Sequence, residues 1–205
     1  SNLGVFETSQ VKKSNRLCLF TSASVKGEAS FVHKSGTLGC KLFHSEIVAY
    51  LHEKHASASL EGFWNGDDDS EISHRVHCSH LAEHTYSRQH YQGVVDGKAR
   101  AVFEGQIYID SIAQKTDSYQ LSKHLLLGES SRGFSKPNLE VFADDVKASH
   151  GATVSRLHDD ELFYLMSRGI KKDDAILLLK ESFLSFFVHQ IDDPNITKSF
   201  MECIE

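Results

Sequence analysis

The chain contains 205 residues, of which 40% are hydrophobic and 24% charged, a composition typical of a globular protein with a sizeable core. Its formal net charge is -6 and no lysine- or arginine-rich block alternates with aromatic residues, which argues against nucleic acid or an anionic membrane surface as a partner. No apolar run approaches the ~18 residues of a membrane-spanning helix, and no signal-peptide pattern opens the chain.

The first part of the chain, residues 1–155, alternates apolar and polar side chains in short bursts, which predicts β-strands. Residues 97–110 are a clear example, with turns expected at Gly97 and Gly105. The predicted strands are four to six residues long. Because no repeat period is legible, a sandwich, a barrel and a stacked solenoid all remain open.

One stretch in this region, residues 45–56, has a periodicity that would also suit a helix. Its β-branched and aromatic side chains fit the neighbouring pattern, and we therefore predict a strand there. The cysteines are widely spaced and form no C-x-x-C pair: Cys18, Cys40, Cys78 and Cys203. So few cysteines in so long a chain argue against a disulfide framework, and we expect a protein of the reducing cytoplasm.

The pattern changes to helical after residue 157. His158 and the acidic residues 159–161 are followed by apolar residues, which predicts a helix start, and Gly169 is expected to end that helix. A second helix is predicted from Asp173 to about residue 191, and a short third helix over residues 195–204.

The second helix carries two apolar stripes at helical spacing. The first contains Ile176, Leu179, Phe183, Phe186 and Phe187, and the second contains Leu177, Leu184 and Val188. A surface helix needs one apolar face, so two stripes indicate burial on both sides. Either the helix is central to a small bundle, or one stripe docks a partner.

A cluster of histidines within residues 74–84 resembles a set of metal ligands. It contains His74, His77, Cys78, His80 and His84. Zinc binds histidine and cysteine at such short spacings, but no H-E-x-x-H motif and no second cysteine pair accompanies them. On a strand His77 and His80 would also face opposite sides, which weighs against one shared site.

The sequence offers few signs of catalysis. It lacks a phosphate-binding G-x-x-x-x-G-K-[ST] loop, since SGTLGCK (35–41) has the wrong glycine spacing, and it lacks a G-x-S-x-G nucleophile elbow. Asp144 and Asp145 could be the paired carboxylates of a glycosidase. If they lie on a strand they point to opposite faces, so we expect one to be solvated and one to point inward.

Three stretches closely resemble the SufB/SufD family, the core subunits of the SUF machinery that assembles iron–sulfur clusters. They are SRQHYQGV (87–94), KARAVFEGQIYIDSIAQKTDSYQLSKHLLL (98–127) and KPNLEVFADDVKASHGATVSRLHDDELFYLMSRGI (136–170). SufB-like members tend to carry a glutamate where this chain has His150, so the resemblance favours the SufD branch. It implies a mainly β fold: a right-handed parallel β-helix over residues 1–155 and a small helical domain over 156–205. Family members are longer, so an N-terminal region is expected to be absent from this chain.

For function, the resemblance implies a scaffold subunit and not an enzyme. Such a subunit pairs with SufB through its β-helix, in the region of residues 95–150, and its helical domain docks the SufC ATPase. Leu177, Leu184 and Val188 are the residues expected to contact SufC. A transient iron–sulfur cluster is expected in the complex, and no stable cofactor in the isolated chain.

The SHGAT segment, residues 149–153, supplies the expected contact with the cluster. The family often has a cysteine where this chain has Ala148, and positions 148 and 150 share one face of a strand. His150 is therefore predicted to be a ligand or relay for the nascent cluster. The alternative is a histidine that bonds to backbone groups of a turn. His77, His80 and His84 have counterparts in the family, which makes a dedicated zinc site a weaker reading.

Two functions from other classes remain open. One is a polysaccharide-active β-helix enzyme that uses Asp144 or Asp145, an idea that rests on fold analogy. The other is a homo-oligomeric structural solenoid, in which exposed strand edges join copies of the chain.

Overall fold

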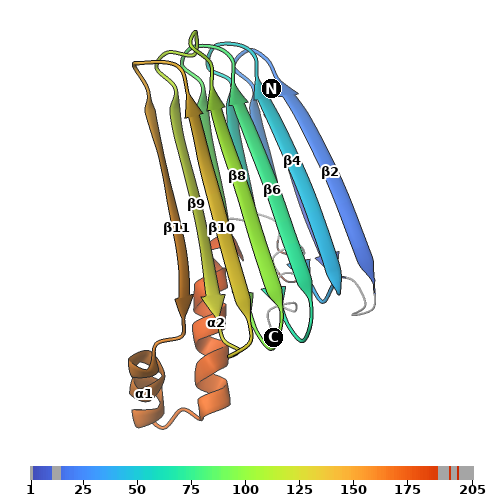
Figure 1. The fold of residues 1–205 in the computed structure, drawn as a ribbon, viewed down its shortest axis with the longest axis vertical. Coiled ribbons are helices and arrows are strands. Elements are labelled where there is room, and N and C mark those ends of the chain that lie inside the picture. The colour runs from blue at the N-terminus through green and yellow to red at the C-terminus, as the bar shows by residue number, and fades with distance from the viewer. Residues whose placement is uncertain (1, 11–14, 189–193, 195–197, 199–205) are drawn as a thin grey trace.

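The computed structural model describes residues 2–10, 15–188, 194 and 198, and consists of two facing sheets followed by two helices (Figure 1). The strands of one sheet are β1 (Asn2–Gln10), β3 (Ser30–Leu38), β5 (Ser57–Gly66), β7 (Tyr86–Val95), β9 (Asp117–Leu126) and β11 (Lys147–Arg156). The strands of the other are β2 (Arg16–Val25), β4 (Leu42–Leu51), β6 (Glu71–His80), β8 (Arg100–Ile109) and β10 (Arg132–Val141). The helices α1 (Asp159–Ser167) and α2 (Lys172–Val188) follow.

Each strand pairs in parallel with the next strand but one along the chain. The sheet orders are β1-β3-β5-β7-β9-β11 and β10-β8-β6-β4-β2. The chain therefore alternates between the two sheets and advances by one rung per pair of strands, which makes a parallel β-solenoid of about 5 turns. This confirms the solenoid and excludes the sandwich and the barrel. The strand expected within residues 45–56 is confirmed as part of β4.

The structural repeat is real but irregular, which explains why the sequence hides it. Ser30, Ser57, Tyr86, Asp117 and Lys147 occupy equivalent positions on successive turns, spaced about 30 residues apart. The spacing changes from turn to turn because the connecting loops differ in length. The side chains at equivalent positions also differ, so no motif repeats.

Two details of the predicted strands are wrong. The strands are 9 or 10 residues long, not four to six. Gly105 was expected to be a turn, but it lies inside β8 and faces the interior, where lack of a side chain makes room for a neighbour. Gly97 does lie in a turn, at φ 57°, a backbone conformation that glycine adopts without strain.

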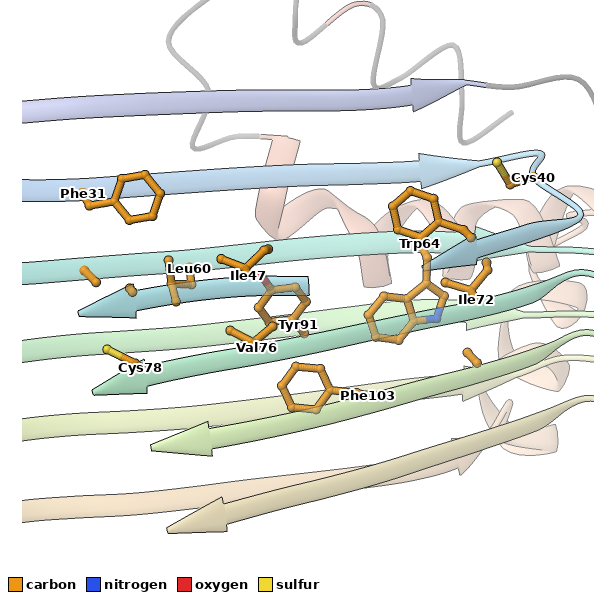
Figure 2. Packing of buried hydrophobic residues seen from close by; sticks show 14 of the residues in the cluster. Phe31, Cys40, Ile47, Leu60, Trp64, Ile72, Val76, Cys78, Tyr91 and Phe103 are labelled. Carbon is orange, nitrogen blue, oxygen red and sulfur yellow. The ribbon is translucent and has the colours of Figure 1, made fainter. Parts of the chain in front are cut away.

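The core lies between the two sheets, where large buried side chains from several strands pack together (Figure 2). Along β8, for example, every second side chain is buried in this interior. Trp64 stacks on His74 with ring centroids 5.1 Å apart, and Phe43 contacts the same histidine at 5.2 Å. Tyr91 and Phe103 continue this aromatic packing at 5.0 Å. The interior therefore combines large apolar side chains with buried polar ones.

Both helices begin largely as predicted and α1 ends as predicted, whereas the end of the second helix expected near residue 191 falls outside the described residues. Three acidic residues occupy the first turn of α1, where they interact favourably with the helix dipole. Gly169 follows the end of α1 at φ 87°, as expected of a C′ glycine. The predicted third helix, residues 195–204, falls almost wholly outside the described residues.

Helix α2 packs on the outer side of β5 and β7. Leu184 and Phe187 are buried there in one cluster with Phe63, Val94 and Leu125. The helical segment thus shares a core with the solenoid, and a division into domains at residue 155 stays a prediction. Within the described part of the chain, no helix is long and apolar enough to cross a membrane.

Candidate functional site

The solenoid is open at the end formed by β10 and β11. Among the described residues, each of these strands pairs on one side only, with β8 and β9 respectively (Figure 1). Large apolar side chains are exposed at this end: Phe134, Val141, Phe142 and Val154. Unpaired strand edges beside exposed apolar side chains are features of a protein-binding surface.

His150 lies on β11 at this open end. Its register partner on β9 is Gln120, and that of Ala148 is Ser118. Both β9 residues are buried in the solenoid interior. Ala148 and His150 therefore share the inward face of β11, but His150 is exposed because no further turn covers it. The histidine lies within a strand and not in a turn. The geometry therefore does not support the alternative role, in which its side chain would bond to backbone groups of a turn.

A polar interior lies next to the open end. His124 on β9 is fully buried, and its Nε2 is 3.1 Å from the hydroxyl of Ser135 on β10. That hydroxyl lies 2.8 Å from the hydroxyl of Ser122. Burial lowers the pKa of His124 to about 4, so the imidazole is neutral at neutral pH.

The histidines at 77, 80 and 84 do not meet. His77 faces outward on β6 and hydrogen-bonds the Ser79 hydroxyl at 2.7 Å. His80 points into the interior. His84 is exposed in the loop between β6 and β7, where its backbone φ is 56° and its ring stacks on that of His55. Across the residues that the structure describes, no group of three or more histidine, cysteine, aspartate or glutamate residues could hold a metal ion. The opposite orientation expected for His77 and His80 is confirmed.

His80 belongs instead to a buried hydrogen-bond network that the sequence did not reveal. Its Nδ1 and Nε2 each lie 2.8 Å from a hydroxyl, of Thr85 and Ser87 respectively, and Thr85 contacts Thr116 at 3.0 Å. Burial lowers the pKa of His80 to about 4 and raises the pKa of Cys78 to about 12. A neutral imidazole with both nitrogens engaged and a protonated thiol are poor metal ligands, so this network is structural.

The paired carboxylates Asp144 and Asp145 are both exposed, in the loop between β10 and β11. The prediction that one of them points inward is wrong, because the segment is not a strand. Asp145 forms an ion pair with Lys115 on the neighbouring loop. Two solvated carboxylates on a loop do not have the facing arrangement of a glycosidase pair.

The three residues expected to dock an ATPase have different surroundings. Leu184 is 0% exposed against the solenoid, so it is not accessible to a partner in this structure. Leu177 is half-buried, and the side chain of Val188 lies outside the described residues. The exposed apolar side chains of the helices are others: Phe163, Tyr164, Met166 and Leu178.

Comparisons with known proteins agree on one family. Residues 5–183 match the family model described as SUF system FeS cluster assembly, SufBD core domain. The chain is 40% identical over 115 residues to the iron–sulfur cluster assembly protein SufD of Escherichia coli, covering 56% of this chain and 27% of that protein. It is 37% identical over 113 residues to SufD of Bacillus subtilis, covering 55% and 26%. A SufBD family protein of Mycobacterium leprae is 28% identical over 186 residues, covering 87% and 47%.

A parallel β-solenoid that ends in an open rung and is followed by two helices defines the chain as a β-solenoid protein, and no group of side chains that could hold a metal ion is present among its described residues. The chain belongs to the SufB/SufD family of the SUF iron–sulfur cluster assembly system. Its similarity to SufD of two bacteria supports the SufD branch. The matched stretches span about a quarter to a half of these relatives' own length, so the partners of the whole proteins carry over only as proposals.

Proposed function

We propose that the chain is part of a SufD-like scaffold subunit, which pairs with a SufB-type subunit and docks a SufC-type ATPase during assembly of an iron–sulfur cluster. The observation that carries the proposal is the open end of the solenoid, where two unpaired strand edges, exposed apolar side chains and His150 lie together. A scaffold of this kind works by holding partners and cargo in place and needs no catalytic residue of its own.

Pairing with the SufB-type subunit would use β10 and β11, which lie at the C-terminal end of the region around residues 95–150 expected from the sequence and extend slightly beyond it. An edge strand presents a row of unpaired N–H and C=O groups, to which a strand of another chain can bind. Burial of apolar surface at this end adds ~25 cal/mol per Å².

Co-purification of the full-length protein with a SufB-type subunit tests this pairing. The double variant Phe142→Glu, Val154→Glu places charges at the open end and should abolish co-purification. Phe20→Glu is the matched control, because Phe20 is 69% exposed on β2 at the opposite edge of its sheet, and it should co-purify normally. Normal pairing of the double variant would rule out this interface.

Docking of the ATPase would use the exposed face of the helical segment. Phe163 and Leu178 are accessible there, whereas Leu184 supports the attachment of α2 to the solenoid. The double variant Phe163→Asp, Leu178→Asp should lose binding of a SufC-type subunit and keep its fold. Ile112→Asp, an equally exposed site on the loop after β8, should bind normally. Normal binding of the SufC-type subunit by the double variant would show that this face of the helices does not dock the ATPase.

His150 is proposed as a ligand or relay for the cluster, which is the cargo of the complex. Neutral imidazole is a suitable iron ligand, and a thiolate at the neighbouring inward position would be a better one. The side chain of Ala148 has no atom that can bind iron, so further ligands have to come from the partner subunit. The isolated chain should therefore hold no stable cluster.

Reconstitution of the complex with iron and sulfide tests this role of His150. His150→Ala should sharply lower the cluster yield without changing subunit assembly, and Ala148→Cys should leave the yield equal or raise it. A wild-type yield from the His150→Ala complex would end the proposal. Light scattering of the protein with and without the SufB-type subunit separates this function from a homo-oligomeric solenoid.

A further inference from the structure

A ladder of glutamine side chains runs through the solenoid interior beneath His150. Gln89 on β7, Gln120 on β9 and His150 on β11 occupy the same position of three successive turns. Both glutamines are fully buried, and Nε2 of Gln120 donates a hydrogen bond to Oε1 of Gln89. The exposed histidine is therefore the next rung of a buried polar ladder.

The direction of this ladder is fixed at its inner end. Nε2 of Gln89 donates to the backbone carbonyl of Gln106 at 3.2 Å, so Oε1 of Gln89 is the atom left to face Gln120. Gln120 must turn its Nε2 toward that oxygen, and its own Oε1 then faces away from β7. Oε1 of Gln120 is buried and has no hydrogen-bond partner among the described residues. Buried carbonyl oxygens in native proteins nearly always have a donor, so this one lacks an expected partner.

The opposite sheet is shaped to accommodate this amide. A Cβ atom at Gly105 on β8 would lie 2.0 Å from Nε2 of Gln120. Any other residue at this position would displace the amide, because heavy atoms cannot approach so closely. Gly105 and Gln120 therefore form one unit, in which the glycine holds the side chain of the glutamine in the ladder.

We propose that Gln120 is a positioning residue for His150: its Oε1 accepts a hydrogen bond from one ring N–H of that histidine. Strands on successive turns lie ~4.8 Å apart, a distance that a glutamine and an imidazole side chain bridge easily. Neutral imidazole has one N–H and one lone pair, so the acceptor selects the tautomer and turns the other nitrogen toward the open end.

This inference rests on the proposed role of His150 as a ligand. His150 is exposed, and Oε1 of Gln120 has no hydrogen-bond partner within the described chain, so the contact between the two side chains forms when a partner covers the open end. A histidine ligand whose second nitrogen is held by a carbonyl is pre-oriented, which strengthens metal binding.

The test uses the full-length protein assembled with its SUF partners. Gln120→Leu and Gln120→Met remove the acceptor at similar volume, and each should weaken ferrous iron binding ~10-fold or more in competition with a chelator. Gln120→Glu, buried as the neutral acid, keeps an acceptor and should restore most of the affinity. Ser118→Ala is the matched control, because Ser118 is equally buried and in register with Ala148. Pulsed EPR of the reduced cluster should show altered frequencies of the remote ring nitrogen in the Leu and Met variants.

The outcomes separate this inference from the function on which it rests. Loss of affinity in the Leu or Met variant, recovery in Gln120→Glu and an unchanged Ser118→Ala support it. Wild-type iron binding and EPR in the Leu and Met variants, with binding lost in His150→Ala, overturn it and leave the proposed function standing. A loss that Gln120→Glu fails to repair indicates a purely structural glutamine and also overturns it. Wild-type iron binding by His150→Ala would refute both the ligand role of His150 and the positioning role of Gln120.

Discussion

The middle of the solenoid and its open end follow the same side-chain alternation but differ in burial. On β8, every second residue points inward and is buried. The residues of β10 in register with them also point inward but remain partly exposed: Gly133, Ser135, Pro137 and Leu139. The two strands differ in how they are covered, since β8 lies between two strands and β10 has one paired neighbour within the described part of the chain. The last rung is thus shaped like the others but incompletely buried, because no described strand lies beyond it.

The largest effect should come from a truncation in the middle of the solenoid. Trp64→Ala removes a fully buried side chain and leaves a cavity among His74 and its aromatic neighbours. We expect a loss of ~3–5 kcal/mol in the free energy of unfolding, measured by urea denaturation. Val154→Ala at the open end should cost less than ~1 kcal/mol, because that side chain is already 47% exposed. Similar costs at both sites would contradict the difference in burial.

Acid should destabilise the protein through its interior histidines. Burial lowers the pKa of His74 to about 3 and those of His80 and His124 to about 4. An unfolded histidine binds a proton below about pH 6.5, whereas the folded one stays neutral, so the free energy of unfolding falls as the pH falls from ~6.5 to ~4. At pH 5 the loss is about 2 kcal/mol for each such histidine.

His124 shows whether this burial extends to the rung beside the open end. His124→Gln should reduce the decline in urea midpoint between pH 7 and pH 5, because one protonation site of the unfolded state is removed without a counterpart in the folded state. An unchanged decline would mean that His124 already takes up its proton in the folded protein, and that the rung is looser than its burial suggests.

The fold was predictable where local chemistry decides it. Alternation identified the strands, and Gly97 and Gly169 marked a turn and a helix end because their backbone conformations favour glycine. The repeat was not predictable, because loops of unequal length shift it and its interior positions accept many residues. Gly105 was misassigned because an inward glycine and a turn glycine look alike in sequence, and the side chain it accommodates lies on another strand.

The candidate site was predictable in part. That positions 148 and 150 share a face follows from strand geometry alone. The burial of Leu184 does not follow, since both stripes of α2 are apolar and tertiary packing decides which one faces the solenoid. The glutamine ladder was missed, although Gln89 and Gln120 are 31 residues apart, close to the repeat. Aligning successive turns would have revealed it.

Alanine substitutions of two strand glycines, the inward Gly105 and the outward Gly151, compare the two regions more finely. Gly105→Ala in β8 would place its Cβ 2.0 Å from the amide of Gln120, and we expect a loss of ~1–3 kcal/mol from the resulting displacement. At Gly151 in β11 the nearest atom is the flexible end of Leu121 at 3.2 Å, so alanine there should change stability by less than ~0.5 kcal/mol. Thermal unfolding of the two variants measures the difference, and equal effects would show that the outer face of β11 tolerates an added methyl group no better than the interior at β8.

The smallest effect is expected on α1, which has no buried residue. Phe163 is 73% exposed and Tyr164 is 58% exposed, so Phe163→Ser and Tyr164→Ser should each change the free energy of unfolding by less than ~0.5 kcal/mol. Leu184→Ala in α2 should cost ~2–5 kcal/mol by the same measurement, because it empties a site packed against Phe63 on the solenoid. Comparing the serine variants with Leu184→Ala distinguishes the apolar stripe that attaches α2 to the solenoid from the exposed face of the helices. A loss above ~1 kcal/mol from either serine variant would show that α1 contributes to the folded core, and the face assigned to the ATPase would then have to be sought elsewhere on the helical segment.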